Sequence, residues 1–180
     1  MRAAIREEVA LIQPLDELEQ ETRLEVLAWI DSGAELCRLE KPATPPQHLI
    51  AYFALVDDEH LLLVDHINAE LWLPTGGHVD PGEHPRDTVL REAGEELSIE
   101  AEFLRDGPVF VTMTETVGKT SGHTDVSLWY VLRGDRRSSL DFDDSEFYDA
   151  QWFHRADVPL DRTDRHMSRF LQKLYSQQSE

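Results

Sequence analysis

The sequence predicts an α/β protein, because segments with strand-like composition alternate with segments of helical periodicity along 180 residues. Runs rich in β-branched and aromatic residues predict strands, whereas apolar residues three and four positions apart predict helices packed on a core. Hydrophobic residues make up 41% of the chain, which suits a single core. The expected order is helical arm, strands, central helix, strands and final helix. The predicted helices cover residues 2–12, 16–32, 85–97 and about 167–174. The predicted strands cover residues 48–57, 60–66, 109–117, 125–133 and 149–154.

The second predicted helix, over residues 16–32, has the clearest boundaries. Asp16 and Glu19 form a D-x-x-E capping box at its start, in which each side chain satisfies a backbone N–H that the first turn leaves unpaired. Gly33 stands where a helix commonly ends in a left-handed residue. Local chemistry therefore fixes both ends of this helix.

A shorter helix over residues 2–12 precedes it and is ended by Pro14. The proline-rich stretch 41–46 then predicts a spacer. We therefore expect two parts in the chain: an N-terminal helical arm with its spacer at 1–46, and a single globular unit at 47–180.

Composition limits which binding partners and which cellular compartment are expected. Seventeen Lys and Arg against thirty-six Asp and Glu give a net charge of −19, which repels a nucleic-acid backbone and excludes polymeric nucleic acid as an expected partner. A small phosphorylated substrate is compatible with this charge when divalent cations neutralise it. With one cysteine, Cys37, and no apolar run of membrane-spanning length, we expect a cytoplasmic protein without a membrane contact, as a monomer or homodimer.

The central helix carries the most informative residues. Pro85 suits the first helical position, so the helix is predicted over 85–97. At 100° per residue, Glu92, Glu95 and Glu96 share one arc beside the apolar stripe. Like charges at this spacing destabilise a helix, and either solvent screening on an ordinary surface or a bound hard cation such as Mg²⁺ would compensate.

The pattern around this helix resembles the signature of the Nudix hydrolase family, G-x5-E-x7-R-E-U-x-E-E-x-G-U with U bulky and apolar. Six of its seven fixed letters are present, at Gly77, Glu83, Arg91, Glu92, Glu95 and Glu96. The segment before it, 71–77, looks like the family's Trp-Leu-Pro-x-Gly-Gly entry. The resemblance covers about residues 48–157 and implies a Nudix-type α/β/α sandwich with a mixed central sheet, preceded here by the helical arm.

One fixed letter differs, because Ser98 stands where the family has glycine. That glycine closes the helix in a left-handed conformation, where serine costs on the order of 1 kcal/mol. Stability is affected by this departure more than chemistry.

The resemblance also implies site residues and a cofactor, Mg²⁺ or alternatively Mn²⁺. The metal ligands it implies are Glu92, Glu95, Glu96 and the carbonyl of Gly76, with Glu146 as a further acidic ligand from a later loop that also offers Asp141, Asp143 and Asp144. Glu95 or Glu146 is the candidate general base. The resemblance implies that Glu83 and Arg91 brace the loop onto the helix. Gly77 and Glu83 are therefore assigned to structural support, and Arg91, for which bracing is also expected, is placed in the catalytic set.

Three further residues are candidates for substrate binding. Lys119 lies in the Gly-Lys-Thr-Ser-Gly loop, although the P-loop spacing is absent and a solvent loop is the alternative. His123 precedes a predicted strand, with an exposed turn residue as the alternative, and Trp72 is either a base-stacking platform or core. No Cys/His cluster has zinc spacing, so zinc is not expected.

The expected activity is hydrolysis of the diphosphate linkage in a nucleoside triphosphate, an oxidised nucleotide or a nucleotide sugar. Thr114 and Glu115 stand where ADP-ribose-cleaving members carry a proline, and the tyrosine typical of dinucleoside-polyphosphate cleavers is also missing there. The alternative function is a catalytically inactive Nudix-fold module that binds a nucleotide for regulation. The intact set of carboxylates favours the enzyme.

Overall fold

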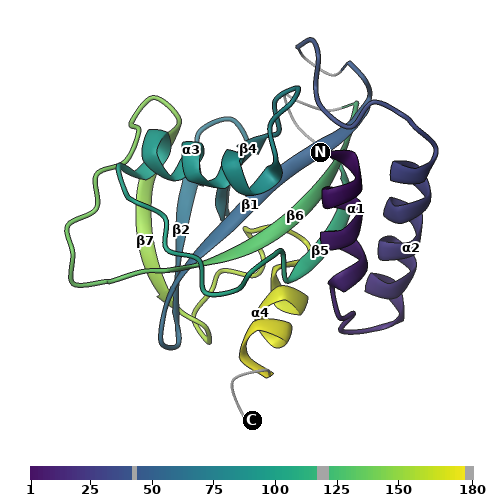
Figure 1. Ribbon diagram of the computed structural model, residues 1–180. Helices are drawn as coiled ribbons and strands as arrows, with labels where there is room; N and C mark the ends of the chain where they lie inside the picture. The colour runs from purple at the N-terminus through teal and green to yellow at the C-terminus, as the bar shows by residue number, and fades with distance from the viewer. Residues whose placement is uncertain (42–43, 117–121, 177–180) are drawn as a thin grey trace.

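A twisted mixed sheet lies between helices on both of its faces in the computed structural model, which describes residues 1–41, 44–116 and 122–176 (Figure 1). The helices are α1 (Arg2–Leu11), α2 (Glu17–Asp31), α3 (Pro85–Leu97) and α4 (Met167–Ser176). The strands are β1 (Gln47–Asp57), β2 (His60–His66), β3 (Leu71–Leu73), β4 (Thr75–His78), β5 (Phe110–Glu115), β6 (Thr124–Arg133) and β7 (Phe147–His154). The predicted α/β class and element order are confirmed.

The sheet has the order β3-β2-β1-β6-β5, with β4 paired to β1 and β7 paired to β2. β1 and β6 run parallel over ten residue pairs, beginning with Gln47 opposite Thr124 and His48 opposite Asp125. The other pairings are antiparallel, so the sheet is mixed, as expected. The parallel pairing places the N-terminal ends of β1 and β6, which are far apart in the sequence, side by side.

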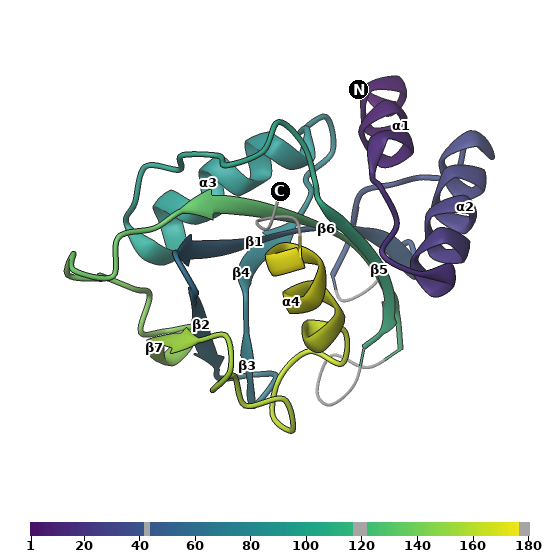
Figure 2. The same ribbon diagram turned by 90° about the horizontal axis from the view of Figure 1, so that it is seen from below.

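Helices α3 and α4 lie on opposite faces of the sheet (Figure 2). A hydrophobic cluster on each face holds these layers together. On one face, the odd-numbered residues of β1 such as Leu49 and Phe53 share a cluster with buried residues of α1, α2 and α3. On the other face, Ala54 and Val56 pack with α4, whose Phe170 lies 4.8 Å from the ring centroid of fully buried Trp129. This alternation follows from the two-residue period of a strand.

Local signals set the helix boundaries as predicted. The Asp16 side chain accepts a hydrogen bond from the Glu19 backbone N–H, which is the first half of the predicted capping box. Glu19 accepts its bond from the backbone N–H of Leu15, one residue before the N-cap, and not from that of Asp16. Gly33 follows α2 with a φ of 82°, and Ser98 ends α3 with a φ of 52°. Both residues therefore adopt the left-handed conformation expected from the sequence.

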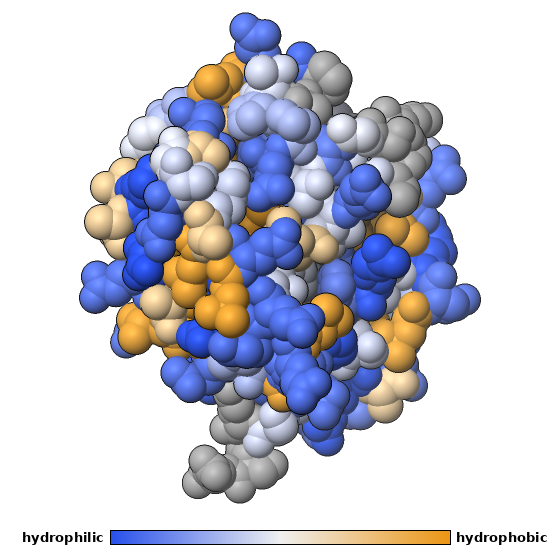
Figure 3. Space-filling model, turned by 90° about the vertical axis from the view of Figure 1, so that its right-hand side faces the viewer, coloured by the Kyte–Doolittle hydropathy of each residue, from blue (hydrophilic) through white to orange (hydrophobic). Residues whose placement is uncertain are grey.

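The predicted strand-like segment 71–77 becomes two short strands, β3 and β4, separated by Pro74, which has no N–H to continue a ladder. β5 ends at Glu115, whereas the predicted end at Val117 lies outside the described residues. Each helix in the described ranges is too short or too polar to cross a bilayer. The face over α1 and α2 is mainly hydrophilic with separate hydrophobic clusters (Figure 3).

Candidate active site

α3 orients its three glutamates differently, although they share one side of the helix. Glu96 is buried, with 6% of its surface exposed, and the Glu92 side chain is 13% exposed. The Glu95 side chain is 63% exposed. Two carboxylates therefore face the sheet and the third faces solvent.

Arg91 connects α3 to the loop that precedes it. Its Nε and Nη2 donate to the two carboxylate oxygens of Glu83, at 3.1 and 3.0 Å, and Nη2 also donates to the His78 carbonyl at 3.3 Å. Nη1 donates to Glu92 at 2.7 Å and to Glu95 at 3.3 Å. These bonds raise the pKa of Arg91, so one guanidinium both braces the loop and neutralises part of the acidic face.

The glycine pair before the loop is required by close packing. Gly76 has a φ of 142°, and a Cβ there would overlap the Ala51 carbonyl oxygen of β1. A Cβ at Gly77 would overlap the carboxylate of Glu92. The Gly76 N–H donates to Oε2 of Glu96 at 3.0 Å. The strand thus approaches α3 closely enough for backbone and carboxylates to share one site.

Burial dominates the electrostatics of the two inner carboxylates. It raises the pKa of Glu96 to about 9, and the charge of Glu92 adds to this shift against the opposing hydrogen bond from Gly76. The pKa of Glu92 is also raised by burial, although Arg91 opposes the shift. Buried carboxylates with raised pKa values indicate a place where a cation would be stabilised.

Glu146 lies in the loop before β7, exposed to solvent. Its charge contributes to the raised pKa values of both Glu92 and Glu96, so it is near both carboxylates. Asp143 from the same loop donates its backbone N–H to the Glu96 carbonyl at 2.9 Å. The tertiary fold therefore brings the later acidic loop to α3.

The donor set of this face fits a hard divalent cation, because its oxygens come from carboxylates and a backbone carbonyl. The carboxylates are not tightly gathered: within the described residues, the group of acidic and histidine side chains with ligand atoms all within 4.8 Å of one another lies elsewhere. Glu92 and Glu95 are both bound to Nη1 of Arg91, whereas Glu96 is bound to the Gly76 N–H instead. Binding of an ion would require side-chain rotation, which the exposed Glu95 permits.

The predicted substrate-binding residues are not all placed together. Lys119 lies outside the described residues. Trp72 is half-buried on β3 and packs edge-on against Phe153, with ring centroids 5.1 Å apart. His123 is buried, with 6% of its surface exposed, so the alternative of an exposed turn residue is wrong.

A cavity of about 520 Å³ lies between α1 and the loop 105–109, away from the carboxylates of α3.

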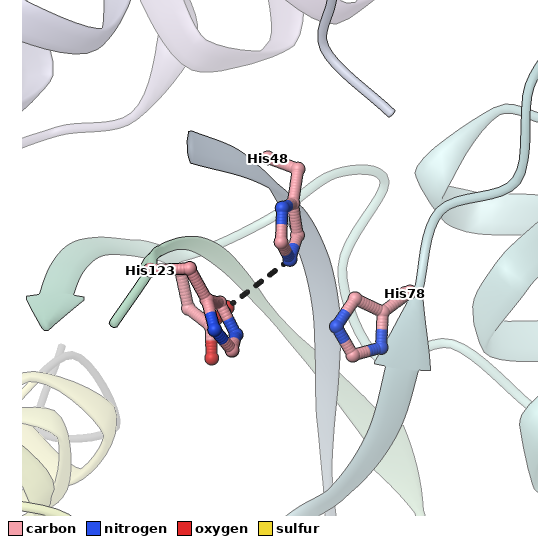
Figure 4. Close-up of side chains that lie close together, drawn as sticks. His48, His78 and His123 are labelled. Carbon is pink, nitrogen blue, oxygen red and sulfur yellow. Dashed lines mark ion pairs between the residues drawn. The ribbon is translucent and has the colours of Figure 1, made fainter. Parts of the chain in front are cut away.

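A group of residues that the sequence pattern missed surrounds His123. His48 on β1 and His78 on β4 lie beside it (Figure 4), and a ligand atom of Asp125, on β6, lies within 4.8 Å of one from each histidine. Burial lowers the pKa of His78 to about 3 and raises that of Asp125 to about 7, although Arg38 opposes the latter shift. The ligand spacings typical of zinc sites are short separations between Cys and His residues along the sequence. His48 and His78 are far from each other and from His123 in the sequence and come together through strand pairing, so such spacings could not reveal them.

Comparison with known proteins agrees with this geometry. A family model described as NUDIX domain matches residues 46–174. The asymmetrical bis(5'-nucleosyl)-tetraphosphatase of Rattus norvegicus is 45% identical over 58 residues, which are 32% of this chain and 40% of that protein. The chain thus matches less than half the length of this curated relative.

Solved structures share the fold. The MutT NUDIX hydrolase from Burkholderia pseudomallei has a TM-score of 0.60 at 23% identity, covering 71% of this chain and 98% of that one. The NUDIX domain of Shewanella oneidensis NrtR, in complex with ADP ribose, has a TM-score of 0.55 at 20% identity, covering 74% of this chain and 89% of that one. At these identities the similarity shows the architecture.

Proposed function

The chain belongs to the Nudix hydrolase family, and on that premise we propose that it is a divalent-metal-dependent pyrophosphohydrolase of small nucleotides. It would cleave the diphosphate linkage of a nucleoside diphosphate joined to a further group. The observation that carries the proposal is the folded signature: Arg91 clamps Glu83, while Glu96 is buried and Glu92 largely covered beside Gly76 and Gly77. A merely solvated acidic face would not bury two carboxylates and raise their pKa values.

The proposed metal ligands are carboxylates of α3 and of the loop before β7, together with one backbone carbonyl. They are Glu92, Glu95, Glu96, Glu146 and the carbonyl of Gly76. Bound Mg²⁺ or Mn²⁺ would neutralise phosphate charge and acidify a water molecule. The Gly76 N–H fixes one oxygen of Glu96 and leaves the other available.

The proposed general base is Glu95 or Glu146, because both are exposed carboxylates near the buried pair. Either would accept the proton of the attacking water, which approaches phosphorus opposite the leaving phosphate. Arg91 would keep the helix and loop in register and hold Glu92 and Glu95 on the same side. Trp72, on β3, is the proposed contact for the nucleobase.

The proposed substrate class is small because a net charge of −19 disfavours polymeric nucleic acid. Nucleoside triphosphates, oxidised nucleotides and nucleotide sugars remain the first candidates. The similarity to a bis(5'-nucleosyl)-tetraphosphatase adds dinucleoside tetraphosphates to them. These compounds share a nucleoside bonded to a chain of at least two phosphates.

The decisive experiment is a substrate panel assayed with Mg²⁺ and with Mn²⁺, with chromatography of the nucleotide products. We expect one class to be cleaved at a phosphoric anhydride. Glu95→Gln and Glu96→Gln should each lower kcat/KM on that substrate by at least about 100-fold, as expected for loss of a base or a metal ligand. Glu100→Gln, at an exposed position just beyond α3, is the matched control and should keep the wild-type rate.

Loss of fold must be separated from loss of chemistry. Gln retains an oxygen that can accept the Gly76 N–H, and it cannot ionise. Because the fold raises the pKa of Glu96 from 4.5 to about 9, metal-free stability falls as pH rises between these values. Glu96→Gln should therefore be at least as stable as wild type at neutral pH in EDTA, as measured by thermal unfolding.

Two results would overturn the enzymatic proposal. Wild-type rates in Glu95→Gln and Glu96→Gln would remove their assigned roles. Failure of every substrate to be cleaved, together with tight binding of one nucleotide, would instead identify the regulatory module that is the alternative function.

A further inference from the structure

Four side chains of types that can ligate a metal ion meet at one end of the sheet, separate from the carboxylates of α3. Three are histidines, His48 at the start of β1, His78 at the end of β4 and His123 just before β6 (Figure 4), and the fourth is Asp125 on β6. One ligand atom from each lies within 4.8 Å of every other. The rings of His48 and His123 stack with centroids 4.9 Å apart, and those of His48 and His78 are 5.0 Å apart.

Strand pairing creates this group, which we call the histidine cluster. The parallel register sets His48 beside Asp125, and the antiparallel register sets Ile50, on the same face of β1 as His48, opposite His78. That face of β1 also carries Ala54, which packs on the α4 side of the sheet. Glu92 and Glu96 belong to α3, on the opposite side. The histidine cluster is therefore distinct from the carboxylate site.

The hydrogen bond of His48 fixes which of its ring nitrogens faces the cluster. Nδ1 lies 2.9 Å from the Pro45 carbonyl, which can only accept, so Nδ1 carries a proton. In a neutral ring Nε2 then presents a lone pair, and it lies 3.6 Å from Oδ1 of Asp125. Two electron pairs facing each other in a buried place repel unless a proton or a metal cation lies between them. An imidazole held through its other nitrogen by a carbonyl is also the usual arrangement of a metal ligand.

Unsatisfied atoms point to the same conclusion. Within the described residues, Nε2 of His48, Nε2 of His78 and Oδ1 of Asp125 are buried without a hydrogen bond. His48 is fully buried, so leaving its polar atom unpaired carries a free-energy cost. Nε2 of His123 lies 3.2 Å from the same oxygen of Asp125, within ion-pair range. A coordinated ion would satisfy all of these atoms together.

We propose that His48, His78, His123 and Asp125 form a transition-metal site that takes Zn²⁺. Three imidazoles and a carboxylate suit zinc better than Mg²⁺, which prefers oxygen ligands. Tetrahedral bonds of about 2.0–2.1 Å require donors roughly 3.3 Å apart. The present spread of up to 4.8 Å therefore closes by about 1–1.5 Å on binding, and His78, which is only half-buried, has room to move.

The bound ion would join three strands near the carboxylate site without belonging to it. His78 lies two residues after Gly76 on β4, so an ion held by His78 would anchor this strand to β1 and β6. The four ligands are not catalytic residues of the proposed hydrolase, and metal binding is measured without an activity assay, so the zinc site and the hydrolase activity are tested independently.

The test is titration of the metal-free protein with Zn²⁺ by calorimetry and with Co²⁺ by visible absorption, which reports tetrahedral coordination. We expect one tight equivalent, with Zn²⁺ bound at a Kd of about 1 µM or tighter, and a rise in Tm of about 5–10 °C at a hundredfold excess over Kd. His78→Gln and Asp125→Asn should each weaken binding by at least about 100-fold and abolish the Co²⁺ spectrum.

Two variants provide matched controls. His154→Gln removes a histidine from another histidine pair, with His60 at 5.2 Å, and should leave the Co²⁺ spectrum and the Kd unchanged. Glu96→Gln should also leave the spectrum unchanged, which separates this site from the carboxylates. His78 is half-buried, so His78→Gln should keep a native circular dichroism spectrum. Wild-type protein without a tetrahedral Co²⁺ band, or equal Zn²⁺ affinity in wild type and folded His78→Gln, would overturn the proposal.

Discussion

Ser98 shows how one residue can weaken an element without touching the site. It ends α3 with φ 52° and ψ 35°, a left-handed conformation in which an L side chain crowds its own backbone. Its side chain is exposed and so makes no core contact that would offset this cost. Glycine at this position relieves the strain, because it has no Cβ.

Ser98→Gly should therefore stabilise the protein by about 1 kcal/mol, less a few tenths for the greater freedom of glycine in the unfolded chain. Urea unfolding measures the difference. Ser98→Ala is the matched control, because alanine keeps the Cβ and should give no gain. Equal stabilisation by Ala and Gly would show that backbone strain at this residue is not the cause.

At the scale of elements, the arm is joined to the C-terminal helix by a buried ion pair. Lys173 of α4 donates to Glu19 of α2, and these residues are 3% and 0% exposed. Burial lowers the pKa of Lys173, and the hydrogen bond to Glu19 opposes that shift. The arm and α4 are thus coupled through two buried charges, each of which would be destabilising without the other.

Lys173→Met should cost about 3–5 kcal/mol of stability, because it leaves the Glu19 carboxylate buried without its cation. The double variant Glu19→Gln with Lys173→Met should recover most of that loss, since it removes both charges and keeps an acceptor for the helix cap. Arg133→Met breaks an exposed pair with Glu102 and should cost less than about 1 kcal/mol. Chemical unfolding of the four proteins tests this, and a double variant as unstable as Lys173→Met would contradict it.

At the scale of the whole molecule, net charge opposes compactness. Thirty-six acidic residues against seventeen basic ones leave a charge of −19 on 180 residues. Self-repulsion of this kind destabilises a folded state, and salt reduces it by screening. Surface pairs such as that of Arg6 with Asp31 are weakened by the same screening, but seventeen basic residues can neutralise less than half of the thirty-six acidic ones.

Raising NaCl from about 0.1 M to about 1 M shortens the Debye length from about 10 Å to about 3 Å. We expect Tm in EDTA to rise by a few degrees, since repulsion outweighs the surface pairs. Sucrose at equal osmolality is the control, because it is excluded from the protein surface but does not screen charges. It should raise Tm less than NaCl does. A fall of Tm with NaCl would mean that favourable ion pairs dominate the surface.

The sequence by itself determined the elements and the carboxylate face. Capping chemistry at Asp16, the helix start at Pro85 and the spacing of Glu92, Glu95 and Glu96 are local features, so they could be read from neighbouring residues. Glu83 and Arg91 are only eight residues apart in the sequence, and the predicted bracing of the loop by this pair matches the observed hydrogen bonds of Arg91 to Glu83. The roles of these residues in catalysis stay predictions.

Only the tertiary structure decided which distant residues meet. His48 and Asp125 are neighbours because β1 and β6 pair in parallel, and that register depends on how both strands pack between α3 and α4. The same packing buried His123, where the sequence also allowed an exposed turn. Contacts between residues far apart in the chain result from the packing of the whole core, so no local pattern encodes them.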